Sequence, residues 1–201
     1  MAENELIKDV ASNTEKSDTY KKILSNYYKS RRQGFYFEGL LLIYALLEDR
    51  TSSILYYCGF TKKKNRRSAT GREKIKQDIK IILGGELKGF NTFSKKLNTI
   101  DKIVKWAKSD AKPQTDFQRD LKRSINRSKS LEKILKTVES LNGDWRENRN
   151  KIIHGLANKD YFDAQNAAKE ICKQGKDAFD VLDRFSKLMK NKEIREKFKI
   201  Q

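Results

Sequence analysis

The chain has 201 residues, the length of one domain with a sizeable core. Its 45 Lys and Arg outnumber its 27 Asp and Glu, giving a formal net charge of +18, so we expect a polyanionic partner, nucleic acid before a membrane surface or an acidic protein. The aromatic content of 10% excludes a wholly disordered chain, and the longest apolar run, GLLLIYALL at 39–47, is far short of the about 20 residues that a membrane span needs.

The two cysteines, Cys58 and Cys172, have neither CxxC spacing nor a neighbouring histidine. We therefore expect buried, reduced thiols and no zinc site. The N-terminus, MAENELIKDV, is acidic and polar, which is not the pattern of a signal peptide. These features predict a soluble, cytoplasmic protein.

Apolar residues recur at spacings of three and four, which predicts amphipathic helices, and alternating strand patterns are nearly absent. The run at 40–47 is apolar on every side, so its helix should be the buried centre of an all-α bundle. Gly84-Gly85, AKPQTD at 111–116 and LNGD at 141–144 are the expected breaks. We expect one domain over 1–201 with a frayed segment at 1–15, a basic loop at 61–71, and helices at 17–32 (with Ser17 as N-cap), 35–58, 72–83, 91–109, 116–140, 145–154 and 160–190.

The short helix predicted at 145–154, capped by Asp144, carries the only histidine of the chain. On a helical wheel Trp145 and Ile152 share one face, and Ile153 lies at its margin. This face should be buried. A lone histidine is most often a satisfied core residue, but here His154 falls on another side of the wheel.

That other side carries a stripe of polar residues one turn apart, Arg146, Asn150 and His154, joined by Glu147, and Arg149 lies at the border of the apolar face. Imidazole can give or take a proton near neutral pH, and guanidinium binds phosphate bidentately and stabilises added negative charge. Asn150 can orient the imidazole or bond the substrate. The set suits metal-independent RNA transesterification, in which the 2′-OH is deprotonated and attacks the adjacent phosphate. No carboxylate cluster suited to a metal ion is evident.

One histidine cannot act as both general base and general acid in one site. This shortage suggests a homodimer in which the helix 145–154 of each chain meets at a two-fold interface and forms one composite site. A water molecule or a lysine is the alternative source of the second group.

The hexapeptide RNKIIH, with Arg149, Asn150 and His154, resembles the R-x4-6-H motif of the HEPN superfamily. That pattern has Arg, a polar residue, three variable residues and His, near the end of a helical bundle. The superfamily includes toxin ribonucleases of toxin–antitoxin and abortive-infection systems and nuclease domains of RNA-guided CRISPR effectors. The resemblance implies a metal-independent endoribonuclease without cofactor, working as a homodimer with paired motifs in one cleft. The family also includes inactive members that serve as binding modules.

Two further positions bear on the resemblance. Many abortive-infection members have an acidic, arginine-containing stretch on an early helix, and LLEDR at 46–50 looks similar, which makes Glu48 a supporting residue beside Arg146. A charged end of the buried run is an equally good explanation for Glu48. Members paired with a nucleotidyltransferase antitoxin often carry a tyrosine two residues after the histidine, and here that position is Leu156.

A basic surface is the expected contact for RNA phosphates, with affinity that falls steeply with salt. For any one of these cations, an ordinary solvated position is the simpler explanation. Tyr27, Tyr28, Tyr56 and Tyr57 are candidates to stack on bases, although most are expected in the core. The candidate RNA-binding residues are Lys62, Lys63, Lys64, Arg66, Arg67, Arg119, Lys122, Arg123 and Arg127.

Three functions fit this sequence. The first is a toxin or antiphage ribonuclease restrained by an antitoxin, either RNA or protein. The second is a non-catalytic RNA-binding module in a complex with a structured RNA. The third is a helical scaffold for an acidic protein, which copurifying nucleic acid would argue against.

Overall fold

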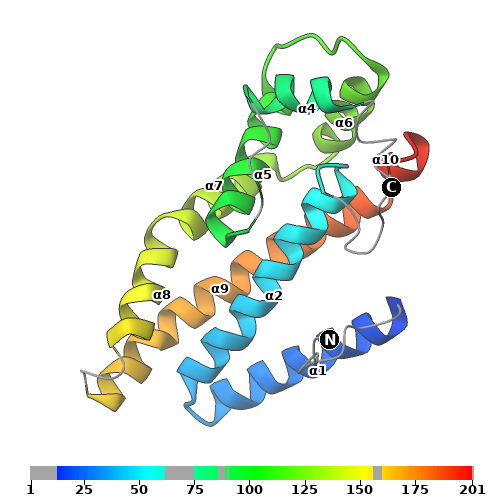
Figure 1. The fold of residues 1–201 in the computed structure, drawn as a ribbon. Coiled ribbons are helices and arrows are strands. Elements are labelled where there is room, and N and C mark those ends of the chain that lie inside the picture. The colour runs from blue at the N-terminus through cyan, green and yellow to red at the C-terminus, as the bar shows by residue number, and fades with distance from the viewer. Residues whose placement is uncertain (1–12, 62–74, 86–88, 90, 156–159, 201) are drawn as a thin grey trace, which may run out of the picture.

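The computed structural model describes residues 13–61, 75–85, 89, 91–155 and 160–200 (Figure 1). These residues form helices and no strand, which confirms the predicted all-α bundle. Most of the predicted basic loop, part of the frayed N-terminal segment, and Leu156 lie outside them. The helices are α1 (Asn13–Arg32), α2 (Tyr36–Tyr57), α4 (Lys76–Leu83), α5 (Phe93–Lys108), α6 (Asp116–Asn126), α7 (Leu131–Asn142), α8 (Asp144–Gly155), α9 (Tyr161–Lys190) and α10 (Ile194–Lys197).

Helices α2 and α9 lie side by side at the centre of the bundle and run in the same direction (Figure 1). Helix α1 packs on α2 as the first arm of a hairpin, and α8 packs on α9 near its start. Helices α5 and α7 cover the pair, and α4 and α6 pack on α5 at the opposite end from α8. Buried hydrophobic side chains from each of these helices belong to one cluster.

The prediction of a central helix at 40–47 is confirmed, because Leu40, Ile43 and Leu47 are fully buried. The helix is not buried on every side, however, since Leu41 keeps 44% of its surface exposed. Both cysteines are free and buried, as expected. Burial raises the pKa of the Cys58 thiol to about 12, so this thiol stays protonated and inert.

The predicted helix at 116–140 is wrong as one element, because α6 ends at Asn126 and α7 begins at Leu131. The connection contains Ser128 and Ser130, and the backbone N–H of Ser130 donates to Ser128 Oγ at 3.4 Å. Serine side chains compete with the backbone for such hydrogen bonds and interrupt helices. The break lets α6 pack on α5 and α10 while α7 packs on α5, α8 and α9.

The start of α1 and the segment after α9 also differ from the prediction. Helix α1 begins at Asn13, so Ser17 is an exposed interior residue and not an N-cap. An ion pair of 2.8 Å between Lys16 and Asp49 ties the first turn to α2, a contact that local sequence cannot indicate. Beyond α9, the short helix α10 was not predicted. Its Arg195 donates to the carbonyl oxygens of Tyr56 at 3.1 Å and Thr61 at 2.6 Å.

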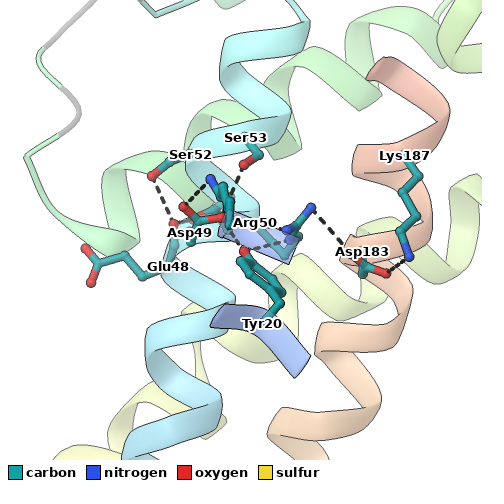
Figure 2. Close-up of polar contacts among 10 residues, drawn as sticks. Tyr20, Glu48, Asp49, Arg50, Ser52, Ser53, Asp183 and Lys187 are labelled. Carbon is teal, nitrogen blue, oxygen red and sulfur yellow. Dashed lines mark hydrogen bonds and ion pairs between the residues drawn. The ribbon is translucent and has the colours of Figure 1, made fainter. Parts of the chain in front are cut away.

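A polar network joins α1, α2 and α9 through the LLEDR stretch (Figure 2). The Tyr20 hydroxyl donates to Asp49 and accepts from Arg50 Nε at 2.8 Å. Arg50 stacks on the Tyr20 ring, 4.1 Å from its centroid, and pairs with Asp183 of α9 at 3.4 Å. Burial raises the pKa of Asp49, but hydrogen bonds from Lys16 and Tyr20 outweigh burial and hold this pKa below its usual value.

We expect Tyr20→Phe to lower the free energy of unfolding by about 1.5–3 kcal/mol, because it removes hydrogen bonds to two charged groups. Tyr57→Phe is the matched control, since the Tyr57 hydroxyl forms no hydrogen bond with a described residue.

Because the pKa of Asp49 is lowered on folding, the contribution of Asp49 to the free energy of unfolding is present above the ordinary value of 3.8 and is lost as pH falls below it. Urea unfolding at pH 7 and pH 3 tests both points. Equal losses for the two variants would contradict the network's role.

No helix among the described residues is long and apolar enough to cross a membrane.

Candidate functional site

Helix α8 is fixed to α9 by its apolar face, as the helical wheel predicted. Trp145 is 1% exposed, and its indole N–H donates to the carbonyl oxygen of Ile171 at 2.8 Å. Ile152 is also buried, and Ile153 is half-buried. Gly175 makes the close approach possible, because a Cβ atom there would lie only 3.1 Å from Trp145 Cζ2. The position of α8 is therefore set by packing.

Arg149 is half-buried and held in one position by α2 and by its own helix. Its guanidinium carbon lies 4.2 Å from the centroid of the Tyr44 ring, and Nη2 donates to Asn150 Oδ1 at 2.6 Å. Nε is buried and has no hydrogen-bond partner among the described residues. Arg149 also forms no ion pair with any described residue. Its charge is thus stabilised by an aromatic face and an amide, without a carboxylate.

His154 is exposed in the last turn of α8, one turn beyond Asn150. No hydrogen bond or ion pair joins it to another described residue. Arg149 and His154 are five residues apart, which places them about 140° apart around the helix axis. A single chain therefore joins Arg149 to Asn150 but does not bring Arg149 and His154 together.

Arg146 connects α8 to two other helices. It donates to Ser94 Oγ of α5 at 2.9 Å and to Asn142 Oδ1 of α7 at 3.4 Å. Asn142 in turn donates to Asn98 Oδ1 at 2.7 Å. These contacts make Arg146 a residue that positions α8.

Glu48 lies on α2 one turn after Tyr44, the ring under Arg149. Its carboxylate pairs with Lys96 of α5 at 3.2 Å, and it forms no hydrogen bond or ion pair with Arg149, Asn150 or His154. The next residues of LLEDR belong to the network in Figure 2. Glu48 therefore makes no polar contact with the motif residues.

The predicted RNA-binding residues do not gather around α8. Lys62, Lys63, Lys64, Arg66 and Arg67 lie outside the described residues. The others belong to α6 and its C-cap, at the opposite end of the molecule (Figure 1). There Arg119, Arg123 and Arg127 are exposed, and Arg119 pairs with Asp116.

Lys122, the fourth cation of this group, has a structural partner. Its ammonium group donates to the carbonyl oxygens of Ser109 at 2.6 Å and Ala111 at 2.7 Å. These contacts close the C-terminal end of α5. Lys122 is therefore less available for phosphate than its exposed neighbours.

Tyr44, which supports Arg149, was not among the predicted site residues. A signal was available, because Tyr44 is the one polar aromatic residue in the otherwise aliphatic run GLLLIYALL. A tyrosine in such a run suggests a polar or cationic neighbour. What the sequence could not indicate is that this neighbour comes from residue 149.

Exposed aromatic side chains lie near the end of α8. Phe162 is 75% exposed and Tyr161 50% exposed at the start of α9, and Phe35 is 46% exposed just before α2. The starts of α2 and α9 are adjacent, because the backbone N–H of Phe37 donates to Gln165 Oε1 at 2.9 Å. Figure 1 shows α8 ending at this end of the bundle.

Among the described residues, no group of three or more His, Cys, Asp and Glu side chains is placed to hold a metal ion. In the comparisons with known proteins, no family model, no curated protein and no solved structure matches this chain.

Proposed function

We propose that this chain is a metal-independent endoribonuclease of the HEPN type that acts in the cytoplasm as a toxin or antiphage effector. Arg149 and His154 carry catalysis, and Asn150 orients them. The observation that supports this function best is that the half-buried Arg149 has no anionic partner among the described residues. A cation withdrawn from water normally has an anionic partner, and Arg149 has none among the described residues. An RNA phosphate supplies that anion.

The reaction needs three groups. A base removes the proton of the 2′-OH, and the 2′ oxygen then attacks the adjacent phosphorus. The bond from phosphorus to O5′ breaks, and an acid returns a proton to O5′. The products carry a 2′,3′-cyclic phosphate and a 5′-OH. His154 takes one proton-transfer role, and Arg149 stabilises the added charge on the phosphoryl oxygens.

The second proton-transfer group comes from another chain in this proposal. His154 and Arg149 of one α8 point to different sides, so a two-fold pairing of α8 helices brings the His154 of each chain near the Arg149 of the other. The exposed aromatic side chains beside α8 give such a homodimer an apolar contact surface.

Arg149→Lys is the direct test of the enzyme. The variant keeps the positive charge but loses the planar fork and the ring stacking, so cleavage of single-stranded RNA in EDTA should fall by about 100-fold or more. Arg123→Lys is the matched control at an exposed arginine and should retain activity. Wild-type rates in Arg149→Lys, or no cleavage by the wild type in EDTA, would contradict the proposal.

Phe162→Asp tests the dimer. A buried charge in an apolar interface is costly, so this variant should elute as a monomer in size-exclusion chromatography with light scattering and lose cleavage. Ile81→Asp, at a 39% exposed residue of α4 away from α8, should remain a dimer. A wild-type monomer that cleaves RNA would rule out the composite site.

The alternative function is a non-catalytic RNA-binding module. It is favoured by the exposed arginines on α6, which lie far from the motif, and by the absence of a described partner that orients His154. Salt-sensitive RNA binding by the wild type without any cleavage would support this alternative. If the chain is a toxin, its antitoxin, an RNA or a protein, should copurify with it and keep it inactive.

A further inference from the structure

A pocket of about 590 Å³ lies where α1 turns into α2, apart from the motif on α8. Sites for small molecules have volumes of about 300–1,000 Å³, so this pocket is large enough for a mononucleotide. The described residues of its lining are polar and aromatic, namely Ser25, Tyr28, Arg31, Arg32 and Tyr36.

The two arginines of this pocket have no anionic partner among the described residues. Neither Arg31 nor Arg32 forms an ion pair with a described residue, and none of the described lining residues is Asp or Glu. Arg31 makes one long hydrogen bond, from Nη1 to the Tyr27 hydroxyl at 3.5 Å, and its Nε is buried without a partner among the described residues. Two guanidiniums that line one pocket and have no anionic partner among the described residues can form a site for a group with several anionic oxygens, such as phosphate.

The two tyrosines give the pocket aromatic walls beside these cations. Tyr28 is 46% exposed, whereas its neighbour Tyr27 is fully buried. Lys169 of α9 adds positive charge, because its Nζ lies 5.7 Å from the Tyr36 ring centroid. Lys176 Nζ lies 5.7 Å from the Tyr28 ring centroid, but its charge is balanced by an ion pair with Asp180 at 2.6 Å. An exposed tyrosine can stack on any nucleobase, since every base presents a π face.

We propose that this pocket binds a nucleoside phosphate, with the arginines holding the phosphate and the tyrosines packing against the base. Two sources carry this chemistry, the 5′-phosphorylated end of an RNA and a free mononucleotide. The first is favoured by position, because the starts of α2 and α9 are adjacent and α8 ends at the same end of the bundle (Figure 1). The proposal does not depend on cleavage by the α8 motif.

Calorimetric titration at physiological salt tests the pocket with the full-length protein. The probes are adenosine 5′-monophosphate, ribose 5-phosphate, and a 2′-O-methyl trinucleotide with and without a 5′-phosphate, which 2′-OH attack cannot cleave. The variants are Arg32→Gln and Tyr28→Ala at exposed lining residues. Lys29→Gln is the matched control, because it removes the same charge from an exposed position of α1 that does not line the pocket.

We expect the mononucleotide to bind and the affinity to fall by about tenfold or more in Arg32→Gln and Tyr28→Ala, but not in Lys29→Gln. Tighter binding of the 5′-phosphorylated trinucleotide than of the mononucleotide assigns the pocket to an RNA end, and the reverse assigns it to a free nucleotide. No binding at millimolar concentration, equal losses in Lys29→Gln, or equal affinity for ribose 5-phosphate would overturn the proposal. Arg149→Lys should bind adenosine 5′-monophosphate like the wild type, which separates a failure of this pocket from a failure of the ribonuclease.

Discussion

Replacing His154 with alanine is expected to lower the rate of RNA cleavage by about 10²- to 10⁴-fold, the usual contribution of a general acid or base. The free energy of unfolding should stay within about 0.5 kcal/mol of the wild-type value, because His154 is exposed and no hydrogen bond or ion pair to a described residue is lost. Cleavage assays in EDTA and urea unfolding of the same preparation measure both quantities.

Lys151→Ala is the matched control for this variant. Lys151 is also exposed on α8 but lies outside the stripe of Arg146, Asn150 and His154. Its replacement should leave both cleavage and stability close to wild type. Equal activity losses in the two variants would mean that α8 contributes only general positive charge or helix stability, and that His154 has no catalytic role.

Trp145→Ala, unlike His154→Ala, should lower the free energy of unfolding by about 3–5 kcal/mol. The indole is 1% exposed, fills the space over Gly175 and donates a hydrogen bond to α9. Surrounding helices cannot collapse fully into the cavity, because Tyr44 and Phe93 are themselves packed at 6.4 Å from the Trp145 ring. Loss of this side chain should therefore loosen α8, and cleavage should fall as a consequence of lost structure.

Trp106→Ala offers the same substitution at the other tryptophan of the chain. Trp106 is half-buried on α5, so its replacement should lower the free energy of unfolding clearly less than the replacement of Trp145. Urea unfolding monitored by circular dichroism gives both values. Equal losses at the two positions would contradict the view that Trp145 is the main anchor of α8.

Much of the fold follows from periodicity, because amphipathic faces are local properties of the chain. The apolar face of α8 and the polar position of His154 were both predictable from a wheel over residues 145–154. The interruption between α6 and α7 was missed, although RSKS at 127–130 carries no apolar residue and contains two serines that can bond to the backbone locally. Helix α1 likewise begins earlier than expected, where Lys16 meets Asp49 across two helices.

The candidate site was predictable in composition but not in arrangement. The spacing of RNKIIH indicates which side chains share a helix, and Arg149 and Asn150 do lie together. The contact of Arg149 with Tyr44 joins residues far apart in sequence, so no local pattern contains it. For the same reason the pairing of Glu48 with Lys96 was not predicted.

The central claim is that RNA is cut by attack of its own 2′-OH at the α8 motif. The most direct measurement is incubation in EDTA with a labelled 2′-O-methyl RNA that contains one unmodified ribonucleotide, followed by analysis of the product ends. Attack by the 2′-OH predicts a single cut after that ribonucleotide, leaving a 2′,3′-cyclic phosphate and a 5′-OH. Cleavage of the fully methylated RNA, or products with a 5′-phosphate and a 3′-OH, would contradict it.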